Sequence, residues 1–398
     1  MGLPSFPTLV ASAPAKINLN LDITAKHTSG PQNGFHEISS LFHAIDWSDL
    51  LFLKPVLNTA TYFSLNFSKA STFPVKSPTY DLYQDAPFAK IYQEAKKAFP
   101  SLPSGLHLTL MKNIPIGAGL GGGSSDIAAF LQAVVLWTEK SLWSKKQISF
   151  DDFPDEKKKW MVEMALSYGS DAAFFFRGGF SHITGRGEKI KHLPTIGEKL
   201  VLIYYCGYHV STKEAYRLYD EQSDEQSDGR SDERFDERAS LKRGNGEKVM
   251  KKLIDDLDDW QKNRKESDLS IIHRYQLVQS FLDTSSKNDF FQIMIKRIPH
   301  FDSLWRDFSN FLDLMPFFEK DGKNKIYKSM SGSGSSLYGL FHDTIASGEI
   351  GTLKRLCLEV NRTFTSGKEV DYRKEFRLPP RLFLARLFDR GVSVRCVG

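Results

Sequence analysis

Residues 115–130, PIGAGLGGGSSDIAAF, place five glycines within seven positions, followed by two serines and an aspartate. Glycine loses more conformational freedom on folding than any other residue, so this run indicates close approach of the backbone to something. Apolar residues then recur at the spacing of a helix: Ile127, Phe130, Leu131 and Val134. Ser124 or Ser125 would make a good N-cap for that helix. Because amides at a helix start favour negative charge, the run predicts an anion site.

Three known nucleotide-binding signatures do not fit this run. GAGLGG matches GxGxxG, but helical spacing continues where a dinucleotide fold needs a second strand ending in an acid. No lysine follows in the GxxxxGK[ST] arrangement, and the protein-kinase signatures HRD and DFG are absent from the sequence. A flexible loop is the remaining alternative, and the strong helix signal that follows disfavours it.

The elements around the run indicate how it is positioned. From Ala15 to Ile23 apolar and polar residues alternate, which predicts a strand with Lys16 and Asn18 on the same face. A second alternation over 106–111 predicts a strand that delivers the chain to Pro115.

Further elements follow along the chain. Residues 156–168 have the pattern of a helix that Gly169 ends, after which Ser170 and Asp171 open a short apolar element. Glycine turns within 177–190 predict a hairpin, LVLIYY at 200–205 predicts a buried strand, and helical spacing returns over 249–260. SMSGSGSSLYGLF at 329–341 reads as a glycine-serine turn leading into a strand.

Length and composition predict a two-domain protein. The chain has 398 residues, 41% of them hydrophobic. Its three cysteines are an odd number at wide spacing, which argues against a disulfide framework or a zinc site and for a reducing compartment. We see no targeting signal and no apolar stretch long enough to span a bilayer, so we expect a cytoplasmic protein.

Charge is distributed unevenly along the chain. Five tetrapeptides, DEQS, DEQS, DGRS, DERF and DERA, fill residues 220–239 with nine acids and three arginines, a net −6. The whole chain carries +5, so the remainder carries +11, which suits anionic ligands such as nucleotides and equally nucleic acid. A repeat this polar buries too little apolar area to offset its ordering entropy, so we expect a disordered insertion over about 219–245.

The glycine run resembles the phosphate-binding loop of the GHMP kinases, the family of galactokinase, homoserine kinase and mevalonate kinase. PAKINLNLDIT, NGFHEISSLFHAID, GSDAAFFFRGGFSHITGRGE and SGSGSSLYGLF resemble further family motifs in family order, from about Ala13 to Phe341. Within the family they are most similar to the enzymes that phosphorylate the 2-hydroxyl of 4-diphosphocytidyl-2-C-methyl-D-erythritol. That compound is an isoprenoid precursor of the non-mevalonate pathway.

The resemblance implies an α+β protein with the two-domain GHMP kinase fold. Its N-terminal ATP-binding domain, over 8–198, would be similar to ribosomal protein S5. Its C-terminal domain, over 199–375, would be ferredoxin-like and carry the acidic insertion, and 376–398 would be a basic tail of unknown role. The implied partners are ATP, Mg²⁺ and the small cytidyl-diphosphate substrate, with no nucleic acid or membrane, in a monomer or homodimer.

The resemblance also carries roles onto particular residues. Lys16 and Asp171 correspond to the catalytic pair beside the substrate hydroxyl, and Asn18 would line the same pocket. Phe35 and His36 match an aromatic-histidine pair around the cytosine, with Tyr216 on its other face by a looser alignment. The expected ATP-binding residues are Lys112, Pro115, Ile116, Gly117, Ala118, Gly119, Leu120, Gly121, Gly122, Gly123, Ser124 and Ser125, with Ser124 near magnesium.

The chain departs from the family pattern at several positions, and other roles fit the same residues. The family's Asp-Gly-Tyr-His is Asn33, Gly34, Phe35 and His36 here, and Ala172 and Ala173 stand where members often have Val-Pro. Asp171 could be no more than a helix N-cap. We hypothesise instead that Lys16 orients Asp171 and the hydroxyl, with late proton transfer. The rival functions are another GHMP small-molecule kinase, for homoserine or mevalonate, and a nonenzymatic nucleotide or nucleic-acid binder.

Overall fold

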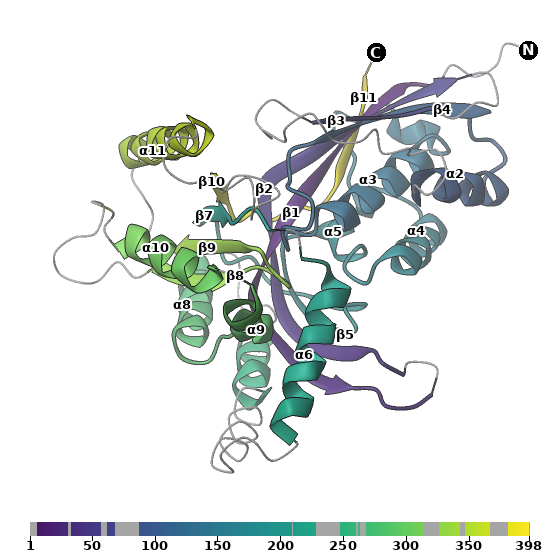
Figure 1. Ribbon diagram of the computed structural model, residues 1–398. Coiled ribbons are helices and arrows are strands. Elements are labelled where there is room, and N and C mark those ends of the chain that lie inside the picture. Colours follow the sequence, from purple (N-terminus) through teal and green to yellow (C-terminus); the bar gives the residue numbers. More distant parts are fainter. Residues whose placement is uncertain are drawn as a thin grey trace, which may run out of the picture.

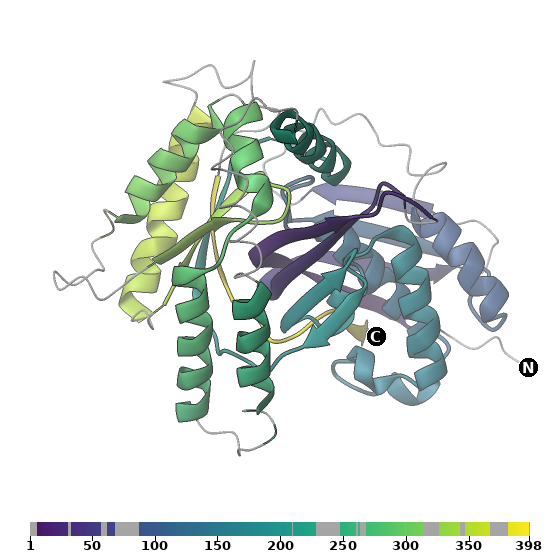
Figure 2. The ribbon, with the colours of Figure 1, turned by 90° about the horizontal axis from the view of Figure 1, so that it is seen from below.

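Two β-sheets with their helices form two lobes that lie side by side (Figure 1, Figure 2). The computed structural model describes residues 6–30, 33–56, 62–67, 87–208, 210–227, 247–259, 262, 268–298, 300–313, 315, 326–342, 347–366 and 381–397. This mixture of helices and sheets confirms the α+β class. In the described parts of the chain, no helix is long and apolar enough to cross a membrane.

The first sheet has seven strands, in the order β11-β1-β2-β4-β3 with β5 and β6 attached to β2. Its strands are β1 (Thr8–Lys26), β2 (His36–Val56), β3 (Tyr62–Phe67), β4 (Gly105–Lys112), β5 (Phe180–Gly185), β6 (Lys189–His192) and β11 (Ser393–Val397). The expected strand before Pro115 and the expected hairpin are therefore confirmed as β4 and as the β5–β6 pair. β1 and β2 are long antiparallel partners, and they form the hairpin that extends past α6 in Figure 1.

β1 is buried without interruption from Ala13 to Leu21 because it contributes to two cores. Leu9, Ala11 and Ala13 belong to one hydrophobic cluster, whereas Ala15, Ile17 and Leu19 belong to the other. The register with β2 shifts between Pro14 and Ala15 and again between Asn18 and Asn20. Such bulges turn a strand locally, so a simple alternation in the sequence becomes a strand whose faces meet different partners.

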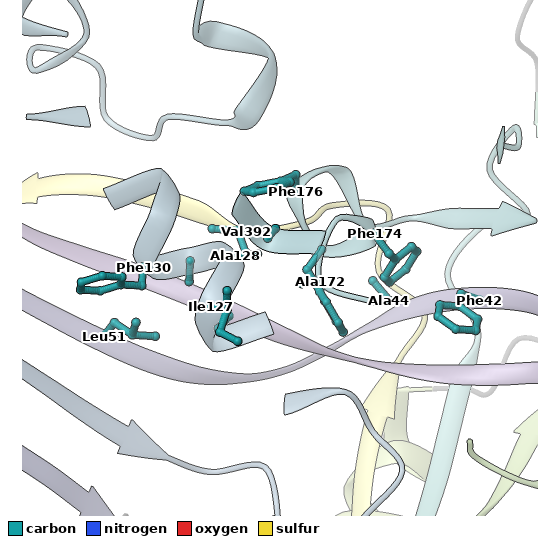
Figure 3. Close-up of a cluster of buried hydrophobic side chains, with 14 of the residues drawn as sticks. Phe42, Ala44, Leu51, Ile127, Ala128, Phe130, Ala172, Phe174, Phe176 and Val392 are labelled. Carbon is teal, nitrogen blue, oxygen red and sulfur yellow. The ribbon is translucent and has the colours of Figure 1, made fainter. Parts of the chain in front are cut away.

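Helix α3 (Gly122–Leu136) is the central helix of the first lobe. Every residue from Ser125 to Leu136 is buried, and the helix contacts β1, β2 and three helices: α2 (Pro87–Ala98), α4 (Asp155–Tyr168) and α5 (Phe174–Arg177). Figure 3 shows Ile127 and Phe130 of α3 in a cluster with Leu51 of β2 and Phe174 of α5. The glycine run is thus joined to the best-buried helix of this lobe. The helix expected over 156–168 is confirmed as α4.

The second sheet has four antiparallel strands in the order β10-β7-β9-β8. They are β10 (Arg381–Arg386), β7 (Leu200–Tyr205), β9 (Ser336–Phe341) and β8 (Ile326–Met330). Its helices are α6 (Thr212–Ser227), a helix over 247–259, α8 (Asp268–Thr284), α9 (Asp289–Arg297), α10 (Phe301–Asp313) and α11 (Ser347–Ser366). The buried strand expected at 200–205 and the helix expected near 249–260 are confirmed.

The last part of the chain belongs to both sheets. β10 pairs with β7 in the second sheet, and β11 pairs with β1 in the first. Within 376–398, the region expected to be a basic tail, residues 381–386 and 393–397 are therefore strands of the two sheets. The run RLFLAR is too short and too basic to reveal a strand by its own pattern, and only its pairing partners make it one.

The acidic repeat begins inside a helix. α6 runs to Ser227, so the first two tetrapeptides, at 220–227, are helical rather than disordered. Residues 228–246 lie outside the described residues. The expected start of a disordered insertion at about 219 is thus wrong, because α6 continues past Leu218 and Tyr219, which pack on its core side.

Candidate active site

The glycine run forms a loop whose carbonyl groups are tied back into the protein. Gly117, Gly119 and Gly121 have φ values of 70°, 75° and 72°, a region that glycine adopts without strain. Four successive carbonyl oxygens accept hydrogen bonds: Gly117 from Val210 N, Ala118 from Ser336 N, Gly119 from Ser331 Oγ and Leu120 from Lys16 N. The donors come from both lobes, so the loop lies where the lobes meet.

The amides of the same loop are free. Among the residues that the structure describes, no protein acceptor pairs with the backbone N–H groups from Gly117 to Ser124. Carbonyls fixed inward and amides left over, at the start of a buried helix, make a site for an anion with several oxygens. The loop therefore has the local geometry of a phosphate cradle.

The helix begins earlier than the sequence predicted. α3 starts at Gly122, and its N-cap is Gly121 in the left-handed region, with no side-chain cap bond. The prediction of Ser124 or Ser125 as N-cap is therefore wrong, because both lie within the first turns of the helix. Ser125 Oγ is buried without a hydrogen-bond partner, and Ser124 Oγ lies 3.3 Å from where a Cβ on Gly169 would be.

Lys16 and Asp171 come together beside this loop. Lys16 Nζ lies 3.7 Å from Asp171 Oδ2 and 4.3 Å from the ring centre of Phe42, and the lysine is buried whereas Asp171 is 29% exposed. Burial lowers the pKa of the Lys16 ammonium group, and the charge of Asp171 opposes that shift. Asp171 lies in the turn before α5, whose N-cap is Ala173, so Asp171 is not the side-chain cap of that helix.

Asn18 holds Lys16 in place. Lys16 Nζ donates to Asn18 Oδ1, and Asn18 Nδ2 donates to Ser40 Oγ at 3.0 Å. Ser40 in turn donates to the carbonyl oxygen of Asn20. Asn18 is itself buried, so its amide is used inside the protein, and it acts on the site through the lysine.

The catalytic candidates and the loop form one site. A Cβ on Gly121 would lie 3.1 Å from Lys16 Cγ, and Ser124 faces Gly169, two residues before Asp171. Positions that are more than a hundred residues apart in the sequence therefore lie close together, and they bring Lys16 and Asp171 next to the start of α3.

Lys112 lies beneath the loop in a buried ion-pair cluster. Its Nζ pairs with Asp126 Oδ2 at 2.7 Å and with Asp49 Oδ2, and a Cβ on Gly122 would lie 3.3 Å from the same nitrogen. Asp49 Oδ1 also accepts from the backbone of Asn113 and, at 2.8 Å, of Ile114. The lysine expected on the nucleotide side thus anchors the strand-to-loop junction from behind.

This cluster predicts a pH-dependent stability. Burial raises the pKa of Asp126 to about 8 from 3.8, although Lys112 opposes the shift. The folded state therefore binds the Asp126 proton more tightly than the unfolded state does. This proton binding stabilises the folded state fully below about pH 4, and the contribution is lost as the pH rises through 8. The free energy of unfolding of Asp126→Asn and of the wild type would be measured in urea at pH 5 and pH 8. The difference, variant minus wild type, is expected to be more positive at pH 8 than at pH 5. Equal differences at both pH values would contradict it.

The base-binding candidates are divided between two places. His36 is buried and stacks on Tyr216, with ring centres 4.6 Å apart, and His36 Nε2 lies 2.7 Å from Asp220 Oδ1. Lys26 Nζ lies 2.9 Å from the other oxygen of that carboxylate. Phe35 points elsewhere and is 49% exposed. Among the described residues no ring contact joins Tyr216 to Phe35, so the structure pairs Tyr216 with His36 and leaves Phe35 open.

Sequence reasoning missed several of these partners. Asp49, Asp126, Ser40 and Asp220 all hold a candidate residue in place, yet none of them was expected to have a role, although Asp126 and Ser40 lie within the motifs at 115–130 and 33–46. Asp220 was assigned to the acidic repeat, where nothing distinguishes it from its neighbours. Its spacing after Tyr216, one helical turn, is the signal that could have found it, because both residues then lie on one face of α6.

Comparison with known proteins agrees with this geometry. Residues 87–179, which include the loop, α3 and Asp171, match the family "GHMP kinases N terminal domain". Over 207 residues the chain is 32% identical to 4-diphosphocytidyl-2-C-methyl-D-erythritol kinase of Persephonella marina, which covers 52% of this chain and 64% of that one. The enzyme of the same name from Bacillus subtilis is 32% identical over 209 residues, 52% of this chain and 62% of that one. The chain thus spans just under two thirds of these relatives' length.

Solved structures show the fold. A crystal structure of 4-(cytidine 5'-diphospho)-2C-methyl-D-erythritol kinase aligns with a TM-score of 0.50 at 19% identity, over 95% of this chain and 98% of that one. Homoserine kinase from Cytophaga hutchinsonii aligns with a TM-score of 0.57 at 12% identity, over 99% and 98%. The resemblance seen in the sequence is confirmed: residues 87–179 match the GHMP kinase N-terminal domain, and the chain has the fold of these kinases.

Proposed function

We propose that this protein transfers the γ-phosphoryl group of ATP to the 2-hydroxyl of 4-diphosphocytidyl-2-C-methyl-D-erythritol. The observation that carries the proposal is the loop from Gly117 to Ser124, with its carbonyls bound inward and its amides free, beside the Lys16–Asp171 pair. The names of the curated relatives support the choice of acceptor.

Phosphoryl transfer depends on positioning and charge neutralisation more than on covalent chemistry. In the proposed reaction the amides of Gly117 to Ser124 would bind the phosphate oxygens. The loop is fixed by donors from Lys16, Val210, Ser331 and Ser336, so its amides need no reorganisation when the phosphates arrive.

The acceptor hydroxyl would lie between the loop and Asp171. Asp171, with its carboxylate partly exposed to the site, would accept the proton as the new phosphate ester forms. Lys16 attracts that carboxylate by roughly 4 kcal/mol at their separation and an effective dielectric near 20, so it orients the carboxylate and weakens it as a base. Proton transfer late in the step follows from this balance.

A magnesium ion would find few protein ligands in this site. Magnesium bound with phosphates takes one or two protein oxygens and completes its shell with phosphates and water, so a large carboxylate cluster is not needed. In the described parts of the chain no group of three or more His, Cys, Asp or Glu side chains could hold a metal. Ser124 lies at the loop-helix junction, and its hydroxyl has no hydrogen-bond partner among the described residues, so it would hold the ion. When bound, the ion would neutralise charge on the β- and γ-phosphates.

Phe35 offers the exposed ring for the cytosine. Phe35→Ala is expected to raise the Michaelis constant for the cytidyl substrate by about 5- to 150-fold, because a stacked base is worth about 1 to 3 kcal/mol. The Michaelis constant for ATP should stay within about twofold, since the phosphate loop is untouched. Steady-state kinetics with each substrate varied in turn would measure both. Equal increases for the two substrates would contradict a base-specific role.

The proposal is tested by ADP release across a panel of acceptor alcohols. The cytidyl-diphosphate methylerythritol, homoserine and mevalonate are compared at equal ATP, with ADP measured by a coupled assay. Turnover with the cytidyl compound and not with the others is expected. Turnover with homoserine or mevalonate would assign the protein to another GHMP activity, and ATP binding without any transfer would favour a nonenzymatic binder.

A further inference from the structure

Arg186 lies over the ring of Phe35. The guanidinium carbon is 5.0 Å from the ring centre of Phe35, and both side chains are exposed. In the described parts of the chain no carboxylate forms an ion pair with the Arg186 side chain. An exposed aromatic ring is thus held beside a cation that has no protein counter-charge.

The turn that carries Arg186 is built rigidly. Gly185 and Gly187 have positive φ values of 69° and 120°, and Arg186 N donates to Glu188 Oε2 at 2.6 Å. Glu188 folds back over Gly185, where a Cβ would lie 2.6 Å from its Oε1. Because the backbone is fixed between the two strands of the β5–β6 hairpin, the arginine is presented at a defined place.

The same turn reaches the reacting end of the site. A Cβ on Gly187 would lie 3.1 Å from Asp171 Oδ1 and 2.9 Å from Ser170 Oγ. Gly187, next to Arg186 in the chain, thus lies against Asp171, the candidate proton acceptor. The side chain of Arg186 lies against Phe35, the ring suited to a base. A substrate that spans from Phe35 to Asp171 must pass over it.

We propose that Arg186 binds the diphosphate of the acceptor substrate, an inference that rests on the proposed function. A nucleoside diphosphate ester whose base stacks on Phe35 and whose alcohol reaches Asp171 carries its negative charge in the middle. The guanidinium group donates several hydrogen bonds in one plane, which matches phosphate oxygens, and it keeps its charge at all working pH values. Arg186 would thus make the site prefer a diphosphate-linked alcohol over a neutral one.

The test compares the binding of CDP and of cytidine by calorimetry, since the two differ only in the diphosphate. Arg186→Ala is expected to weaken CDP binding by about 10-fold or more, because it removes hydrogen bonds between a charged donor and the charged phosphate oxygens. Cytidine binding should change by less than about twofold, and the Michaelis constant for ATP should not change. Arg186→Lys, which keeps the charge and loses the planar fork, should fall between the wild type and the alanine variant.

Lys189→Ala is the matched control, because it removes one exposed positive charge from the same hairpin without touching Phe35. An equal loss of cytidine and CDP binding in Arg186→Ala would overturn the proposal and make the arginine a clamp on the base. Unchanged CDP binding in that variant, alongside weakened binding in Phe35→Ala, would overturn it and leave the proposed function standing. A wild-type protein that binds neither CDP nor cytidine would overturn both.

Discussion

Asp171→Asn is expected to lower kcat by about 10²- to 10⁴-fold, the range for loss of a general acid-base group, with the Michaelis constant for ATP nearly unchanged. Asparagine keeps the shape of the side chain but cannot accept the proton of the hydroxyl, and it removes the charge that faces Lys16 at 3.7 Å. Single-turnover kinetics with the cytidyl substrate would measure the chemical step directly.

Asp155→Asn is the matched control for this experiment. Asp155 begins α4, the helix that leads to Asp171, and its side chain is 98% exposed. It should leave kcat within about twofold, because exposed ion pairs contribute little. A turnover of Asp171→Asn close to that of the control would remove Asp171 from the chemistry and leave the loop as the main contributor.

Among alanine substitutions in the loop, Gly119→Ala is expected to cause the largest loss of stability and activity. Gly119 has a φ of 75°, and a Cβ there would lie 2.8 Å from the Gly334 carbonyl oxygen and closer still to that of Ser331. Both obstacles are backbone atoms, so no side-chain rotation relieves them. Left-handed strain and overpacking together should cost about 2 to 5 kcal/mol of folding stability. Displacement of the amides by about 1 Å should also lower kcat/KM by about 10²-fold.

Two other glycines show whether the effect belongs to the position. Gly351 lies in α11 with nothing within 4 Å of an added Cβ, so Gly351→Ala should retain stability and activity. Gly123→Ala, in the glycine run itself and equally open, should retain stability. Denaturant unfolding and steady-state kinetics of the three variants would be compared. If Gly119→Ala were as stable and active as Gly351→Ala, the loop would be able to rearrange around the added methyl group. That result would contradict a loop of fixed conformation.

Local patterns in the sequence predicted those parts of the site whose structure depends on residues adjacent in the chain. The alternation after Ala15, the helical spacing after Ser124 and the strand before Pro115 are properties of adjacent side chains, and the corresponding elements are present as β1, α3 and β4. The glycine run likewise indicated a strand-to-helix turn with outward amides. Only the first residue of the helix was misplaced, since a glycine in the left-handed region replaced the expected serine cap.

Partners from distant parts of the chain could not be predicted in the same way. Asp220 lies 184 residues from His36, and Asp49 lies 63 residues from Lys112, so their pairing depends on how the two lobes and their strands register. The strands at 381–386 and 393–397 exist because β7 and β1 have unpaired edges. Tertiary context decides such elements, and the local sequence carries little trace of them.

The position of β1 has a consequence for cooperativity. Its first half contributes Leu9 and Ala11 to one apolar cluster, its middle contributes Ile17 and Leu19 to the other, and Lys16 stands between these sets. Each cluster contains residues of both lobes, so unfolding of either lobe would remove packing partners from both clusters. The lobes are therefore thermodynamically coupled, and Lys16, the candidate catalytic lysine, lies on a strand that packs into both clusters.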